Sequence, residues 1–205
     1  MYSPDHFRVD DRATLHAFMQ QHSFATIITH DGCIPHATHM PVLLEANQGP
    51  QGTLVSHMAR ANPQWKHFED GREVLVIFTG PHAYVSPAWY ASAPAVPTWN
   101  YTAVHAYGIP RLINDHDRFA QRLRDLVEFY ESGREGRWDG ELPVEYRDKL
   151  MRGIVGVEIE ITRLEGKFKL SQNRSSEDQQ RVIAALSASA DQTERETAEM
   201  MRFIV

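Results

Sequence analysis

The chain has 205 residues, of which 42% are hydrophobic and 23% charged, and its formal net charge is −6. This length allows one well-buried core, and the negative charge disfavours a dedicated nucleic-acid-binding domain. No apolar run approaches the roughly 20 residues that cross a bilayer, no secretory signal is visible, and the lone Cys33 excludes an intrachain disulfide and fits a reducing compartment. We therefore expect a cytoplasmic protein with one domain over residues 1–205 and a helical C-terminal extension.

The N-terminal segment predicts a helix followed by a β-hairpin. Asp10 or Asp11 can cap the helix. Apolar and aromatic positions at helical spacing give it one face to bury: Leu15, Phe18, Met19 and His22. Residues 24–29 and 36–44 have β character and flank an Asp31-Gly32 turn, which predicts the hairpin.

The middle of the chain predicts further strands separated by loops. A short helix is expected over residues 61–68, with Pro63 in its first turn. Gly80-Pro81 is interpreted as a break between two strands, and residues 87–97 as an irregular loop. The expected strands are residues 53–57, 73–79, 83–86 and 100–113.

The C-terminal half predicts two helices, an alternating strand and two final helices. Asn114 can cap the first helix, whose buried stripe is Phe119, Leu123, Leu126 and Tyr130. The other expected elements are a helix at 144–151, a strand at 154–162 that Phe168 and Leu170 extend, and helices at 178–187 and 193–203. About six strands with peripheral helices predict a mainly β protein with a closed antiparallel barrel.

Familiar catalytic motifs are missing from the sequence. There is no dinucleotide-binding glycine loop, Walker phosphate loop, nucleophile elbow or zinc motif. The eleven histidines are interpreted as ordinary polar or pocket-lining residues rather than a metal cluster. We therefore assign no catalytic residue and no metal ligand.

Three stretches remain as candidate binding segments, each with a structural alternative. Residues 56–65 place Arg60 at a helix start, which suits a terminal phosphate, although Arg60 could equally be a solvated charge beside an Asn62 cap. The segment 99–101 suits a planar heterocycle, but an aromatic corner of the core is the favoured interpretation. The stretch 167–174 has two interpretations. It is either an edge strand whose lysines prevent sheet-to-sheet association or, slightly favoured, the wall of an anion pocket.

Together these stretches resemble the PaiB family of FMN-binding proteins. The matching motifs occur in the family's order and cover nearly the whole chain except its last twenty or so residues: Met1-Tyr2-x-Pro4-x-His6-Phe7, residues 57–65, 78–87, 96–101 and 167–173. The resemblance implies an FMN-binding split β-barrel, an antiparallel Greek-key-like barrel akin to the pyridoxamine-phosphate oxidases. In that superfamily two barrels pack as a homodimer, and flavin lies at their interface.

The resemblance also implies which residues bind the cofactor. His39, Met40 and Pro41 correspond to positions along the isoalloxazine ring. Ser56, Arg60 and Asn62, with His57 beside them, correspond to positions around the phosphate and ribityl chain. Trp99, Asn100 and Tyr101 would reach the pocket from the partner subunit, and Lys169, Gln172 and Asn173 would form its C-terminal wall. The strand 36–45 lacks the cation that the oxidases carry, so the phosphate would depend on Arg60 and backbone groups.

Two kinds of function follow from the resemblance. Members of the family are described as negative transcriptional regulators of sporulation and protease genes. Because no helix-turn-helix stands out and the charge is unfavourable, we expect regulation through flavin, another small ligand or a protein partner rather than through direct DNA contact. The alternative is a flavin-dependent oxidoreductase, or a haem-binding oxygenase with His39, His57 or His105 as axial ligand.

Overall fold

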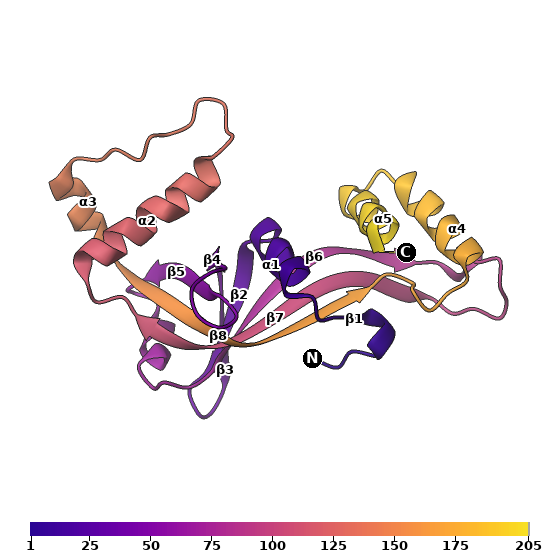
Figure 1. The fold of residues 1–205 in the computed structure, drawn as a ribbon, viewed down its shortest axis with the longest axis horizontal. Helices are drawn as coiled ribbons and strands as arrows, with labels where there is room; N and C mark the ends of the chain where they lie inside the picture. Colours follow the sequence, from indigo (N-terminus) through magenta and orange to yellow (C-terminus); the bar gives the residue numbers. More distant parts are fainter. Residues whose placement is uncertain (205) are drawn as a thin grey trace. The chain divides into compact units, whose positions relative to one another are not determined.

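The computed structural model describes residues 1–204 and contains one eight-stranded sheet (Figure 1). The strands are β1 (Arg8–Val9), β2 (Phe24–His30), β3 (Pro35–Pro41), β4 (Leu43–Glu45), β5 (Thr53–Ala59), β6 (Val74–Val85), β7 (Thr98–Leu112) and β8 (Ile154–Lys169). Their order is β3-β2-β6-β7-β8-β5-β4, and β1 pairs with β8. The mainly β prediction is confirmed.

The expected closure of the barrel is wrong for the described chain, because the two ends of the strand order, β3 and β4, do not pair with each other. The predicted strand 36–44 is divided at Val42. Its N–H still donates in the β2–β3 register to the carbonyl oxygen of Ser23 at 2.8 Å, and from Leu43 onward the chain pairs with β5 instead. β4 is only three residues long and pairs with β5.

Within residues 1–204, five α-helices accompany the sheet: α1 (Arg12–Gln21), α2 (His116–Glu131), α3 (Val144–Met151), α4 (Ser176–Ser187) and α5 (Gln192–Ile204). Asp11 caps α1, because its Oδ2 accepts from the N–H of Thr14 at 2.8 Å. The cap of α2 is Asp115 rather than the expected Asn114, since Asp115 Oδ1 accepts from the N–H of Arg118 at 2.7 Å. The predicted helix 144–151 is confirmed.

The described part of the chain also has three short 3₁₀ helices: η1 (Asp5–Phe7), η2 (Pro63–Phe68) and η3 (Pro87–Trp89). The helix expected at 61–68 is therefore the 3₁₀ turn η2, with Asn62 as its cap. Between residues 1 and 204, no helix combines the length and apolar character needed to cross a membrane.

Gly80-Pro81 does not interrupt the chain as expected, because β6 continues through both residues. A Cβ atom on Gly80 would lie 2.7 Å from the ring of Phe18 and even nearer to the hydroxyl of Thr102. Glycine therefore stands here because neighbouring side chains approach the backbone closely, not because the strand ends.

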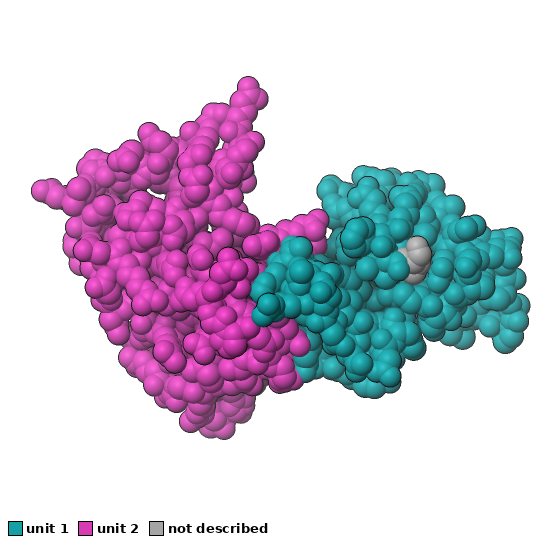
Figure 2. All heavy atoms as spheres, viewed as in Figure 1, with its two compact units in different colours: residues 1–18, 78–105, 165–205 teal, residues 19–77, 106–164 magenta. Residues whose placement is uncertain are grey.

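The contacts divide the chain into two compact units (Figure 2). Unit 1 comprises residues 1–18, 78–105 and 165–205, and buries Phe168, Leu170, Leu186 and Met201 among its core residues. Unit 2 comprises residues 19–77 and 106–164, and contains β2 to β5 with α2 and α3. The expectation of one functional domain stays a prediction.

Candidate functional site

Arg60 directly follows β5 and joins it to the beginning of β8. Its Nε donates to the carbonyl oxygen of Arg152 at 2.9 Å, and its Nη2 donates to that of Ile154 at 3.0 Å. The indole Nε1 of Trp65 in turn donates to the carbonyl oxygen of Arg60 at 3.0 Å. The guanidinium thus has a structural role through two of its five N–H donors, and Nη1 carries two of the donors that remain for a ligand.

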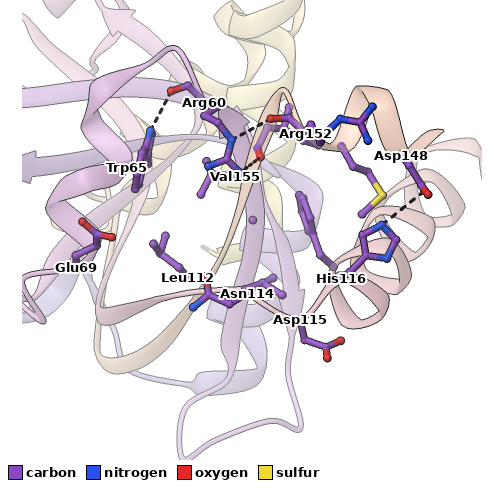
Figure 3. Close-up of a pocket in the computed structure, with 15 residues that line it drawn as sticks. Arg60, Trp65, Glu69, Leu112, Asn114, Asp115, His116, Asp148, Arg152 and Val155 are labelled. Carbon is purple, nitrogen blue, oxygen red and sulfur yellow. Dashed lines mark hydrogen bonds and ion pairs between the residues drawn. The ribbon is translucent and has the colours of Figure 1, made fainter. Parts of the chain in front are cut away.

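A cavity of about 470 Å³ lies beside Arg60 within unit 2 (Figure 3). The end of β7, the beginning of α2, and the end of α3 with the start of β8 complete its walls. Arg60 and Trp65 stand on one side of the view, whereas His116 points toward Asp148 on the other. The His116 Nε2 atom lies 3.6 Å from Asp148 Oδ1.

The charges that line this cavity are mixed. Arg60 and Arg152 are opposed by Glu69, Asp115 and Asp148. A doubly charged phosphate gains little from such a lining, because the carboxylates offset the two arginines. Binding of a flavin phosphate would therefore depend on Arg60 itself rather than on the field of the cavity.

Asn62 is tied into a polar network beside Arg60. Its Oδ1 accepts from the N–H of Gln64 at 3.0 Å, as a helix cap does, and its Nδ2 donates to Thr38 Oγ1 at 2.9 Å. Thr38 donates to the side-chain oxygen of Gln64, which is 3% exposed. The sequence interpretation missed Thr38 and Gln64, because nothing local indicates that they meet across 26 residues.

β3 presents His39 and Met40 to opposite faces. His39 is exposed, its Nδ1 lies 2.8 Å from Thr26 Oγ1, and its ring stacks on Phe24 with 6.4 Å between centroids. Met40 is 3% exposed, so its side chain belongs to the core. The carbonyl oxygen of Pro41 accepts from Ser56 Oγ at 2.5 Å, which leaves the buried Ser56 hydroxyl only as an acceptor.

In unit 2, His57 carries a buried nitrogen that lacks a hydrogen-bond partner within the described residues. Its Nδ1 is buried and makes no hydrogen bond within residues 1–204. Burial lowers the pKa of the imidazole and therefore favours its neutral form. In the β5–β8 ladder His57 pairs with Gly156, a residue that lines the 470 Å³ cavity. His57 itself does not line this cavity, so its Nδ1 is a buried polar atom on β5 rather than a cavity contact.

The three candidates on β7 differ in exposure. Asn100 is fully buried, and its Nδ2 donates to Ser171 Oγ at 3.0 Å and to Met201 Sδ at 3.3 Å. Trp99 is 54% exposed, and Tyr101 is half-buried with the Lys167 Nζ atom 5.3 Å from its ring centroid. Asn100 is therefore an internal support, while Trp99 can meet a ligand or a partner.

The C-terminal candidates are largely engaged in local bonds. Lys169 Nζ donates to Thr98 Oγ1 at 2.6 Å and to the carbonyl oxygen of Trp99 at 2.5 Å. Burial, followed by the nearby charges of Lys167 and Arg174, lowers the pKa of Lys169. The Gln172 side chain accepts from the N–H of Leu170 and donates to the carbonyl oxygen of Phe168, whereas Asn173 is exposed.

The thirteen candidates thus fall into two sets, one in each unit. His39, Met40, Pro41, Ser56, His57, Arg60 and Asn62 belong to unit 2. Trp99, Asn100, Tyr101, Lys169, Gln172 and Asn173 belong to unit 1. Their common role in one cofactor site stays a prediction.

Two solved structures define the fold class. The flavocytochrome Anf3 from Azotobacter vinelandii is similar with a TM-score of 0.63 and 18% identity, over 79% of this chain and 69% of that chain. The FAD and heme binding protein from Mycobacterium smegmatis gives a TM-score of 0.62 and 16% identity, over 87% and 79% of the two chains. The chain has the flavin-binding split β-barrel fold, here with an open sheet.

The sequence comparisons identify the family. The family model described as "Putative FMN-binding domain" matches residues 1–163. The "Protease synthase and sporulation protein PAI 2" of Bacillus subtilis is 37% identical over 98% of this chain and 96% of its own length. An uncharacterized protein of Emericella nidulans is 35% identical over 72% and 73% of the two chains. The chain belongs to this FMN-binding-domain family, which confirms the resemblance to PaiB.

Proposed function

We propose that this protein binds FMN as a cytoplasmic homodimer and acts as a negative transcriptional regulator that responds to flavin or another small ligand. The observation that carries the proposal is the 37% identity to the Bacillus subtilis protein over nearly the full length of both chains. Its printed name associates that relative with protease synthesis and sporulation. The net charge of −6 supports an indirect route to gene control instead of direct DNA binding.

The proposed site uses unit 2 of one subunit and unit 1 of the other. Arg60 Nη1 would hold the phosphate, His39 and the Pro41 region would border the ring system, and Asn62 would border the ribityl chain. Trp99 and Tyr101 of the second copy would cover the ring. Bound FMN can accept and donate electrons, and the residues named here would orient it and exclude water from its ring.

A second candidate function is a flavin-dependent oxidoreductase or a haem-binding oxygenase. The half-buried His57 favours it, because its Nδ1 has no hydrogen-bond partner within residues 1–204 and burial favours the neutral imidazole, the form that binds haem iron. Two structures with this fold are named as a flavocytochrome and as an FAD and heme binding protein. A Soret band that appears on haem addition and is lost in His57→Ala would support this candidate.

The test of the first proposal is a titration of the purified protein with FMN and, in parallel, with riboflavin, which lacks the phosphate. We expect Arg60→Ala to weaken FMN binding by roughly tenfold or more, because a charge-assisted hydrogen bond is removed. Riboflavin binding should be nearly equal in wild type and Arg60→Ala. The matched control is Arg72→Ala, since Arg72 is an exposed arginine of unit 2 that does not line the cavity.

The outcomes separate a phosphate contact from a structural effect. If Arg60→Ala weakens FMN and riboflavin equally, the arginine acts by joining β5 to β8 and does not bind phosphate. If wild type takes up neither flavin, the proposed cofactor is wrong, and haem is the next compound to titrate.

A further inference from the structure

A second cavity of about 470 Å³ lies in unit 2, between α2, the segment that connects α2 to α3, and α3 itself. Figure 1 shows the two helices joined by this long connection. Its volume is in the range of small-molecule sites. None of the thirteen candidate flavin residues lines it.

The walls of this cavity are mainly apolar, although four carboxylates, Asp125, Glu128, Asp139 and Glu141, also line it. Leu123 and Val127 come from α2, Trp138 and Leu142 from the connection, and Leu150 and Met151 from α3. Trp138 and Leu150 remain 46% and 49% exposed. An apolar ligand bound in the cavity would cover these large, exposed apolar side chains.

The rim of the cavity carries one arginine without an acidic partner. Arg147 donates twice to Asp148 Oδ1, at 3.1 and 3.0 Å, and Arg137 forms an ion pair with Glu128. Arg124 instead donates to the neutral Gln121 Oε1, at 3.2 and 2.6 Å, and no carboxylate of residues 1–204 pairs with it. Its guanidinium can therefore exchange an amide oxygen for a ligand carboxylate, which is the stronger acceptor.

We propose that this cavity binds a small hydrophobic carboxylate, with its apolar body between α2 and α3 and its carboxylate on Arg124. A neutral apolar molecule would leave Arg124 unused, and a small polar anion would leave the apolar walls exposed. The cavity shares Met151 and Ile154 with the one beside Arg60, but none of the candidate flavin residues lines it, so the proposal does not depend on flavin binding.

The test is calorimetric titration of the full chain with 3-phenylpropionate and with its neutral amide, followed by ligand-observed NMR. We expect saturable binding of the carboxylate, at least tenfold weaker binding of the amide, and a similar loss for the carboxylate in Arg124→Gln. Leu150→Glu should also abolish binding, and because Leu150 is half exposed this variant should fold. The matched control is Arg181→Gln on α4, outside this cavity, which should bind like wild type.

Three results would overturn the proposal. These are no saturable binding by wild type, equal affinity for acid and amide, and an unchanged affinity in Arg124→Gln. Repeating the titration with FMN-saturated protein separates the two proposals, because we expect no competition. Displacement of the carboxylate by FMN would also count against a separate site.

Discussion

At the scale of single residues, Gly156 shows how one missing side chain permits the packing of α2 on β8. A Cβ atom built on Gly156 would lie 2.5 Å from two ring carbons of Phe119 and 3.2 Å from Ile113 Cδ1. The Phe119 ring is 7% exposed and packs with Ala120 and Met151. It cannot move away freely, because its neighbours are also buried.

We expect Gly156→Ala to lower the free energy of unfolding by about 1–3 kcal/mol, because it overpacks this contact. Chemical denaturation of the single variants and of Gly156→Ala/Phe119→Leu would measure the effect. The double variant should recover part of the loss, since the smaller side chain relieves the clash. Strictly additive losses would show that the two residues do not compete for the same space.

Asp178 is a buried carboxylate that secures the loop after η3. Its Oδ1 accepts from the N–H groups of Ala91 and Ser92 at 2.7 and 3.2 Å, and its Oδ2 accepts from Ser92 Oγ at 2.5 Å. The hydrogen bond from the Ser92 side chain is the main cause that lowers the pKa of Asp178. A carboxyl group whose pKa is lowered by folding stabilises the fold above its ordinary pKa of about 4, and this contribution is lost as pH falls through the lowered value.

Wild type should therefore have a higher Tm than Asp178→Asn at pH 7, and the difference should shrink steadily below about pH 4. Thermal unfolding of both proteins between pH 3 and pH 8, roughly the window set by that pKa, would check this. The neighbouring Glu177→Gln is the control, because Glu177 is exposed and makes an i,i+4 ion pair with Arg181. A pH-independent difference for Asp178→Asn would mean that its charge does not matter.

At the scale of elements, the sequence predicted which segments are helical or extended better than where strands end. The spacing of Leu15, Phe18 and Met19 identified α1 and its buried face, at 2, 4 and 0% exposure. The alternation over 154–162, with the predicted extension through Phe168 and Leu170, identified β8, which ends at Lys169. Gly80-Pro81 was misread because a glycine required by a close approach and a glycine that ends a strand look the same in one sequence.

In the candidate site, too, the sequence indicates contacts between residues close in the chain but not contacts between distant residues. The Asn62 cap is a bond between residues two apart, so the sequence could indicate it. The acceptors of the Arg60 guanidinium lie 92 and 94 residues away and are backbone carbonyls, which carry no residue-specific signal. Local pattern could therefore select Arg60 as a candidate but not reveal that it joins β5 to β8.

At the scale of the whole molecule, unit 1 exposes aromatic side chains that a second copy would cover. Trp99 is 54% and Tyr84 42% exposed, their ring centroids lie 6.0 Å apart, and His82 lies 6.2 Å from Trp99. Aromatic clusters of this kind are typical centres of protein interfaces. The proposed homodimer would bury them, and it would bring them to the flavin bound by unit 2 of the other subunit.

We expect Trp99→Ala to raise the dimer dissociation constant at least about tenfold, because truncation of a central interface tryptophan typically costs about 2 kcal/mol or more. FMN binding should fall in parallel, since the site would require both copies. Sedimentation equilibrium and FMN titration at matched protein concentrations would measure the two effects. Trp138→Ala is the control, because Trp138 is 46% exposed but belongs to the α2–α3 cavity of unit 2. A wild type that stays monomeric at micromolar concentration while binding FMN would contradict the shared site, because one subunit would then suffice to hold the flavin.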